Sequence, residues 1–283
     1  MPLDFAAPVV RPQYQANCFA DLPDFVTSVL LGRRPAYLAP AGFERLPQRY
    51  HSVVFLFLDA FGWSFYARWR ERYPFLRRIE DAGSVTRLTS QFPSTTAAHV
   101  TTLLTGLPVG QHGVFEWNYY EPQLDRMITP LLFSFAGDKM PGTLAATGIR
   151  PEAILPEESL GQGLQSHGIT TFAFLHQSYA ASPYNAIINR NDRLVPYKSF
   201  PEGLVNLRLL LERHDGPAFY FFYFDGIDTI CHDYGPDSPQ VEAEIDACLT
   251  ALDRWLARGV RTPGGETLLL VTADHGQTAD DDR

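Results

Sequence analysis

Runs of apolar residues of strand length alternate along this chain with longer segments whose apolar positions recur at helical spacing. This alternation predicts an α/β fold: a doubly wound, parallel or mostly parallel sheet with helices on both faces. The predicted strands cover residues 53–58, 84–88, 170–175, 218–224 and 268–272. The predicted helices cover residues 63–79, 96–105, 201–213 and 238–257.

Residues 115–165 interrupt the alternation, because they are rich in proline, glycine and aromatic residues and have weak periodicity. We expect one α/β domain over residues 1–283, with 115–165 as a small cap or insertion over the site. The sequence stops at Arg283, soon after a predicted buried strand, where a doubly wound fold would continue with another helix. We therefore expect a truncated fragment, or a natural variant without the last part of the fold.

Acidic residues and histidines gather where three of the predicted strands end. They are Asp59 after 53–58, Asp225, Asp228 and His232 after 218–224, and Asp274 and His275 after 268–272. The carboxyl ends of parallel strands meet at one edge of a sheet, so we expect these side chains to lie close together. Carboxylates and imidazoles gathered in this way are what a two-metal hydrolase needs.

Composition narrows the choice of partners. The formal net charge of −9 argues against a nucleic-acid polymer as partner, although bound metal ions would still allow an anionic small substrate. Cysteine is represented by Cys18, Cys231 and Cys248, an odd number without paired spacing, which is typical of reduced thiols. No apolar run approaches 18 residues, and Met1–Phe5 has no basic stretch before an apolar one. We expect a cytoplasmic protein without a membrane segment; the oligomeric state stays open.

A hydroxyl-rich segment begins the predicted helix 96–105. The sequence Pro93-Ser94-Thr95-Thr96 places hydroxyl groups where backbone N–H groups and the helix dipole favour a phosphate. A hydroxyl is a poor nucleophile until it loses its proton, and coordination to a metal ion achieves that. The alternative is that Ser94 or Thr95 only caps the helix, which such residues often do.

Taken together, these motifs resemble those of the alkaline phosphatase superfamily, and within it the type I phosphodiesterase/nucleotide pyrophosphatase family. The resemblance runs from about residue 50 to the end of the chain. The residues that carry it are, in order, Asp59, Thr96, Thr105-Gly106-Leu107, His112-Gly113, Asp228 with His232 and Gly235-Pro236, and Asp274-His275-Gly276.

The resemblance implies a role for each matched residue. Asp59, Asp274 and His275 match the ligands of one metal, which the oxygen of the nucleophile also faces. Asp228 and His232 match two ligands of a second metal. Thr96 matches the nucleophile, with Thr95 as the alternative in case of a register error of one residue. The implied cofactors are two divalent ions, zinc by preference and manganese as the alternative, since mixed carboxylate and imidazole ligands suit zinc.

Two departures from the family pattern matter. His99 stands where relatives often have an asparagine that holds a phosphate oxygen, so it either binds substrate or is a structural histidine. The family also supplies a third ligand of the second metal, a histidine well beyond the Asp-His-Gly motif, and this sequence stops at Arg283. The second metal and full activity are therefore in question.

Several other residues have open roles. His112 is expected to be structural or to lie just outside the ligands, and Asp225 either lies beside the metal ligands or caps a strand end. The aromatic cluster of Trp117, Tyr119 and Tyr120 either stacks on a nucleobase or packs its loop onto the domain.

The resemblance implies a metal-dependent phosphodiesterase or nucleotide pyrophosphatase acting on a nucleotide or related small phosphoester through a covalent intermediate, a phospho- or nucleotidyl-threonine. A phosphomonoesterase or phosphonate hydrolase with the same site is one alternative. A non-catalytic family member is the other, because the third ligand of one metal is absent. Sulfatase chemistry is disfavoured, because the segment around Thr96 lacks the Cys-x-Pro-x-Arg sequence.

Overall fold

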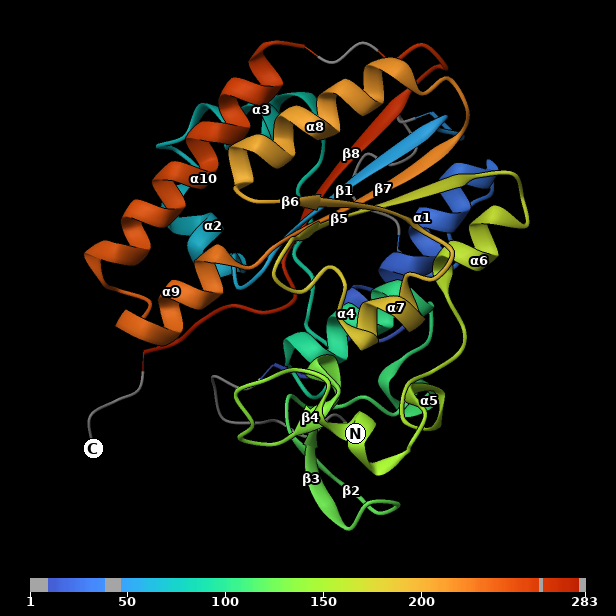
Figure 1. Ribbon diagram of the computed structural model, residues 1–283. Coiled ribbons are helices and arrows are strands. Elements are labelled where there is room, and N and C mark those ends of the chain that lie inside the picture. The colour runs from blue at the N-terminus through green and yellow to red at the C-terminus, as the bar shows by residue number, and fades with distance from the viewer. Residues whose placement is uncertain (1–9, 39–46, 260–261, 280–283) are drawn as a thin grey trace, which may run out of the picture.

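A five-stranded sheet forms the centre of the protein (Figure 1). The computed structural model describes residues 10–38, 47–259 and 262–279; residues 1–5, whose composition entered the expectation about localisation, lie outside these ranges. The strands lie in the order β6-β5-β7-β1-β8, and every neighbouring pair is parallel. They are β1 (Ser52–Leu58), β5 (Thr170–His176), β6 (Arg193–Tyr197), β7 (Ala218–Phe224) and β8 (Thr267–Thr272). The predicted parallel α/β fold is confirmed.

Both faces of the sheet are covered, which explains why its central strands are apolar throughout. Every residue of β1 is buried, and alternate side chains enter two separate cores. Phe55 and Phe57 enter one core, whereas Leu56 and Leu58 enter the other. The sequence pattern of a continuous apolar run therefore reflects a strand with a helical layer on each side.

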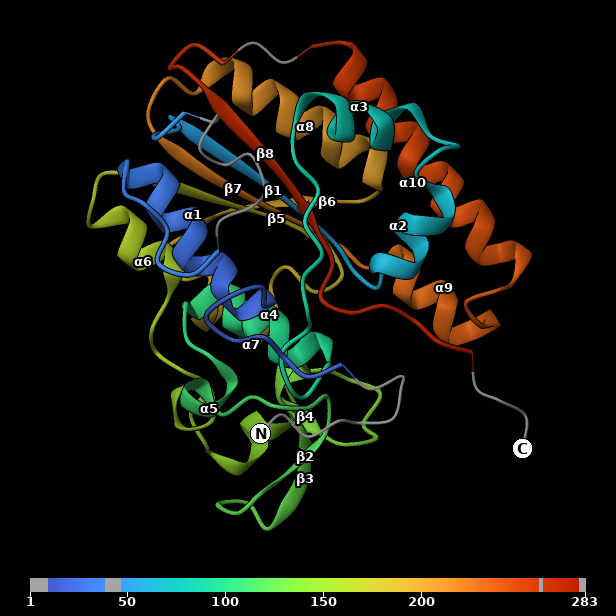
Figure 2. The ribbon, with the colours of Figure 1, turned by 180° about the vertical axis from the view of Figure 1, so that it is seen from behind.

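The helices form two layers, seen from opposite sides in Figures 1 and 2. The layer packed on the Phe55 face consists of α1 (Leu22–Leu31), α4 (Thr96–Thr105), α6 (Leu160–Gln165) and α7 (Pro183–Ile188). The layer on the Leu56 face consists of α2 (Trp63–Trp69), α3 (Pro74–Ala82), α8 (Phe200–Arg213), α9 (Gly226–Tyr234) and α10 (Pro239–Ala257). No helix in the described ranges is both long and apolar enough to cross a bilayer.

Two of the predicted elements need correction. The predicted strand 84–88 is wrong: this segment belongs to no strand, and a single bridge joins Cys18 to Thr89 beside it. Its side chains alternate between exposed and half-buried, so the segment runs over the surface instead of entering the sheet. The predicted helix 63–79 is two helices, α2 and α3, because Pro74 has no N–H for a continuous helix and instead begins a new one.

The predicted cap region contains a second, smaller sheet at the end of the molecule near α5 (Val109–His112) (Figure 1). It is antiparallel and consists of β2 (Tyr119–Glu121), β3 (Arg126–Thr129) and β4 (Ser134–Phe135). Ile128 of this sheet forms a small separate core with side chains from the neighbouring loops, among them Phe133 and Leu144. The division of the chain into one domain with a cap stays a prediction.

Candidate metal centre at the carboxyl edge of the sheet

Three adjacent strands, β7, β1 and β8, deliver the acidic residues to one edge of the sheet. β1 lies between its two neighbours in parallel register, so that all three strands end side by side. Asp59 follows β1, Asp228 lies in the first turn of α9 just after β7, and Asp274 and His275 follow β8. The topology thus brings together residues that are more than 200 positions apart in the sequence.

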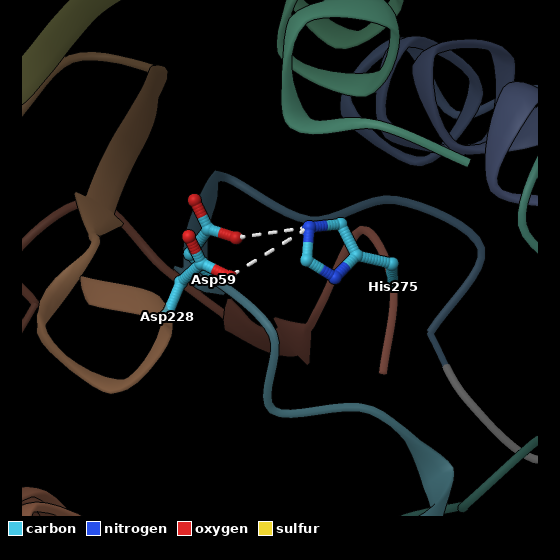
Figure 3. Close-up of side chains that lie close together, drawn as sticks. All are labelled: Asp59, Asp228 and His275. Carbon is cyan, nitrogen blue, oxygen red and sulfur yellow. Dashed lines mark ion pairs between the residues drawn. The ribbon is translucent and has the colours of Figure 1, made fainter. Parts of the chain in front are cut away.

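Asp59, Asp228 and His275 point toward one another (Figure 3). The Nε2 atom of His275 lies 3.6 Å from Oδ1 of Asp59 and 4.0 Å from Oδ1 of Asp228. One ligand atom from each of the three residues lies within 4.8 Å of the others. We call these three residues together with Asp274 the acidic cluster. Asp59, Asp228 and His275 come from both predicted ligand sets, because Asp59 and His275 were matched to one metal and Asp228 to the second.

A close approach of two loops holds His275 beside Asp59. A Cβ atom at Gly62 would lie 2.6 Å from the Cα of Gly276 and 2.7 Å from the carbonyl oxygen of His275, so only glycine fits there. Asp274 ties the same loops together, because its Oδ1 accepts hydrogen bonds from the N–H groups of Ala60, at 3.2 Å, and His275, at 2.9 Å. The backbone therefore fixes the position of the His275 ring.

The acidic cluster has an excess of negative charge. Burial, followed by the charges of Asp274 and Asp228, raises the pKa of Asp59 well above its ordinary value. The Oδ2 atom of Asp274 is buried without a hydrogen-bond partner and lies 3.5 Å from Nε2 of His275. Buried carboxylate oxygens with this little compensation, next to a histidine nitrogen, form a donor set that fits a divalent cation.

Thr96 is the first residue of α4, and its hydroxyl faces the acidic cluster. Its Oγ1 lies 3.2 Å from Nε2 of His275 and 3.4 Å from Oδ1 of Asp59. Thr95 has a different role, because its Oγ1 accepts a hydrogen bond from the N–H of Ala98 and so caps the helix. The helix cap that the sequence offered for Ser94 or Thr95 is thus Thr95, and the role of Thr96 as nucleophile stays a prediction.

His232 lies on the outer side of the cluster. Its Nε2 is 3.3 Å from Oδ2 of Asp228, the oxygen that does not face His275, and its side chain is 74% exposed. Asp228 therefore lies between the two histidines. The predicted roles of Asp228 and His232 as two ligands of the second metal stay predictions.

The structure favours the second alternative for His99, a structural histidine. The ring is fully buried, its Nε2 accepts a hydrogen bond from the N–H of Gln91 at 3.1 Å, and its Nδ1 bonds the carbonyl of Thr95 at 2.7 Å. Burial lowers the pKa of His99 to about 4. Because both ring nitrogens are bonded within the protein, His99 has no free donor for a substrate oxygen. It instead holds the start of α4, and thereby positions Thr96.

His112 is likewise structural, as expected. Its Nε2 bonds the hydroxyl of Thr102 at 2.9 Å, and its Nδ1 accepts from the N–H of Val114 at 3.0 Å. Of the aromatic cluster, Tyr119 of β2 is buried in the core of the small sheet, whereas Tyr120 bonds Asp125 and is exposed.

Two residues at the site have no counterpart among the predicted site residues. The hydroxyl of Tyr223 donates a short hydrogen bond to Oδ2 of Asp59, and the side-chain amide of Gln277 donates to Oδ1 of Asp228 at 2.6 Å. Tyr223 lies within an apolar strand, so its sequence context indicates only a core residue. Gln277 directly follows the Asp-His-Gly motif, and that position was the one available signal.

A pocket of about 130 Å³ lies next to the acidic cluster. Tyr223 lines it and bonds Asp59, and Val100 of α4 lines it one turn after Thr96. Trp117, from the predicted aromatic cluster, and Asp225 also line it. Asp225 is the N-cap residue of α9, and its side chain makes no capping hydrogen bond.

Known proteins resemble this chain over most of its length. A venom phosphodiesterase of Crotalus durissus collilineatus is 25% identical over 243 residues, which cover 84% of this chain and 27% of the relative. The mouse ectonucleotide pyrophosphatase/phosphodiesterase family member 1 is 22% identical over 246 residues, which cover 84% of this chain and 24% of the relative. The chain therefore spans about a quarter of the length of these relatives.

Solved structures show the same fold. An inactive form of murine ectonucleotide pyrophosphatase/phosphodiesterase 5 in complex with AMP superposes with a TM-score of 0.57 at 20% identity, covering 82% of this chain and 59% of that one. Phosphonoacetate hydrolase of Sinorhizobium meliloti 1021 superposes with a TM-score of 0.53 at 18% identity, covering 79% and 55% respectively. The fold is thus alkaline-phosphatase-like.

The family profile covers the whole site. The profile of type I phosphodiesterase / nucleotide pyrophosphatase matches residues 53–282, a range that begins in β1 and includes every residue of the acidic cluster. The chain belongs to the type I phosphodiesterase/nucleotide pyrophosphatase family, within the alkaline phosphatase superfamily.

Proposed function

We propose that this protein is a metal-dependent phosphodiesterase or nucleotide pyrophosphatase in which Thr96 is the nucleophile. The observation that carries the proposal is the position of the Thr96 hydroxyl, 3.2 Å from His275 and 3.4 Å from Asp59, at the start of a helix. A phosphate group is favoured at this place, because the N-terminus of a helix offers free N–H groups and a positive dipole.

The acidic cluster would hold a divalent metal ion through Asp59, Asp274 and His275, with Asp228 and His232 contributing to a second one. Their carboxylate and imidazole donors suit zinc, with manganese as the alternative. Such ions would withdraw electron density from a phosphoryl oxygen and lower the pKa of a nearby hydroxyl. The unpaired Oδ2 of Asp274 and the raised pKa of Asp59 support this assignment, because a cation would relieve both.

The residues of the chain act in two steps. In the first, the Thr96 oxygen attacks phosphorus, its proton leaves toward the acidic cluster, and the leaving group departs with the electrons of the broken P–O bond. In the second, water attacks the phosphorus of the covalent threonine phosphoester, the bond between phosphorus and the Thr96 oxygen breaks, and a proton from the water restores the Thr96 hydroxyl as the phosphate product leaves. Throughout, His99 and the Thr95 cap keep the first turn of α4 in place, so that Thr96 stays aligned.

A nucleotide or related small phosphoester is the proposed substrate. The family supports this substrate, because a structure of a murine relative holds AMP. The pocket beside Asp59 also supports it, since it can take a substituent of the phosphate. A phosphomonoesterase or phosphonate hydrolase would use the same residues.

Hydrolysis of bis-p-nitrophenyl phosphate and p-nitrophenyl phosphate by the zinc-loaded protein tests this proposal. We expect faster turnover of the diester, and a loss of at least about a thousandfold in Thr96→Ala. Thr95→Ala is the matched control. It removes the same hydroxyl from the neighbouring residue and should cost about 0.5–2 kcal/mol of stability while keeping turnover.

Other results of the hydrolysis assay would change the proposal. Loss of turnover in Thr95→Ala but not in Thr96→Ala would move the nucleophile to Thr95. Preference for the monoester would make the protein a phosphomonoesterase. Full activity of both variants would refute a threonine nucleophile.

A further inference from the structure

A groove of about 360 Å³ lies between α8 and α10, two helices that lie side by side on the Leu56 face of the sheet (Figures 1 and 2). Its described lining residues include none of the acidic cluster and none of the pocket beside Asp59. The groove is therefore separate from the proposed catalytic site. Its walls are mainly apolar and are formed by Pro201, Leu204 and Val205 of α8 and by Ala247, Ala251 and Trp255 of α10.

Arginine side chains gather along this groove. Arg208 comes from α8, whereas Arg254 and Arg258 come from the end of α10. None of them forms a salt bridge within the described part of the chain. Asp246 also lines the groove, but its Oδ1 already accepts a hydrogen bond from the Tyr73 hydroxyl at 2.9 Å. The groove thus has an excess of positive charge in a chain whose formal net charge is −9.

The dipole of α10 does not explain this set of arginines. Basic side chains are favoured near the C-terminus of a helix, which accounts for one such residue at the end of α10. However, Arg254 and Arg258 are four residues apart and so repel each other, and Arg208 stands in the middle of α8. An anion between the two helices would attract all three side chains and offset their mutual repulsion.

Two N–H groups of the groove wall lack an acceptor. Nε of Arg208 and Nε1 of Trp255 are buried and have no hydrogen-bond partner among the described residues, and the Trp255 side chain is only 7% exposed. Neighbouring atoms cover both nitrogens, so an acceptor reaches them after a rotation of the two side chains. Because buried donors in native proteins are nearly always bonded, two unbonded donors in one wall point to a ligand that offers oxygen atoms.

The size of the groove favours a small molecule, since its volume lies within the ~300–1,000 Å³ typical of sites for such ligands. The apolar walls suit a hydrocarbon chain, and guanidinium groups suit a carboxylate, which they bind through two parallel hydrogen bonds. We propose that the groove between α8 and α10 binds a medium-chain alkyl carboxylate, with its chain along the apolar walls and its head among the arginines. This inference does not depend on the proposed function.

Calorimetric titration with decanoate tests the inference. The protein is metal-free in this experiment, because a bound zinc ion could itself hold a carboxylate. Decylammonium has the same chain with the opposite charge, and acetate has the same head without the chain. We expect decanoate to bind at least about tenfold tighter than either. Unspecific attraction to a chain with a net charge of −9 would instead favour decylammonium.

Substitutions on both sides of the ligand locate the site. Arg254→Gln, at an exposed position, should weaken decanoate binding about tenfold through loss of a charged donor. Ala251→Phe should weaken it at least as much, because the ring fills the apolar part of the groove and leaves every arginine in place. Arg213→Gln is the matched control, since it removes an exposed arginine of α8 that does not line the groove, and should keep the wild-type affinity.

Decanoate binding no tighter than that of decylammonium or acetate would overturn the inference. So would an affinity for decanoate that stays unchanged in both Arg254→Gln and Ala251→Phe, because the ligand would then bind elsewhere on the protein. Tight binding that both substitutions weaken supports the inference even if the zinc-loaded protein hydrolyses no phosphoester, a result that would refute the proposed function alone.

Discussion

Two groups of polar residues lie near the start of α4, and they differ in how completely they are bonded. The first group is the buried network of Gln91, His99, Thr102 and His112. In it, each ring nitrogen and the Gln91 side chain has a hydrogen-bond partner within the protein, so the network is closed. The second group is the acidic cluster, which combines three carboxylates with one histidine and leaves Oδ2 of Asp274 without a hydrogen-bond partner.

This difference in hydrogen bonding distinguishes the buried network, which stabilises the fold, from the acidic cluster, which can bind a ligand. Burial lowers the pKa of both His99 and His112 to about 4, so the network is uncharged at neutral pH and needs nothing from outside. Burial and neighbouring charge act in the opposite sense on Asp59 and raise its pKa, so the acidic cluster is stable only with a proton or a cation. A histidine inside a family motif is therefore not enough to identify a ligand; its hydrogen bonds decide.

Among the substitutions in these two groups of residues, Asp59→Asn should have the largest effect, a loss of zinc affinity. Zinc affinity, measured by titration against a competing chelator, is expected to fall about a hundredfold or more, because a ligand is lost. The stability of the metal-free protein should rise or stay constant at pH 7. The raised pKa of Asp59 means that its charged form opposes folding above the pKa of the unfolded state, and asparagine removes that charge. A large loss of stability with unchanged zinc affinity would show that Asp59 belongs to the scaffold.

Tyr223→Phe tests whether the hydroxyl of Tyr223, at the edge of the acidic cluster, positions Asp59. The change removes the hydroxyl that donates to Asp59 and keeps the ring, so zinc affinity is expected to fall about 10–100-fold with a lower kcat. Tyr184→Phe is the control, since Tyr184 is another buried tyrosine of the same pocket whose hydroxyl bonds Thr101 instead of a predicted ligand. If the two variants have the same zinc affinity, Tyr223 does not position Asp59.

His99→Asn tests the network. The shorter side chain leaves the N–H of Gln91 or the carbonyl of Thr95 without its partner, which should cost about 1–3 kcal/mol in urea unfolding of the metal-free protein. Zinc affinity should stay within about twofold of the wild type. A rise in KM for bis-p-nitrophenyl phosphate without loss of stability would return His99 to the substrate-binding role considered from the sequence.

The same variant should also reveal a dependence of that cost on pH. The pKa of His99 is about 4 in the folded state and about 6.5 when unfolded, so the unfolded chain binds an additional proton below pH 6.5 and the wild type loses stability as the pH falls. The asparagine variant has no such group, and the contribution of His112 is common to both proteins. Between pH 7.5 and 5 the stability difference should shrink by about 2 kcal/mol. A difference that grows on acidification would contradict the lowered pKa.

The fold and the outline of the site follow from local sequence, because strands buried on both faces are apolar throughout and their parallel ends converge. Asp59, Asp228 and Asp274 could be located in this way without coordinates. The segment 84–88 has the same local character as an edge strand, and only the absence of a neighbouring strand shows that it is none.

What the sequence could not supply depends on contacts between distant residues. Tyr223 is one of several aromatic residues in β7, and its bond to Asp59, 164 positions away, has no local signature. The same holds for the closed hydrogen bonds of His99, which separate its two candidate roles.

A crystal structure of the zinc-loaded protein, with data collected on both sides of the zinc absorption edge, tests the central claim most directly. We expect an anomalous peak within about 2–2.3 Å of a carboxylate oxygen of Asp59 and of Nε2 of His275, with the hydroxyl of Thr96 facing it. A peak away from the acidic cluster, or none, in a protein that still hydrolyses bis-p-nitrophenyl phosphate would contradict it.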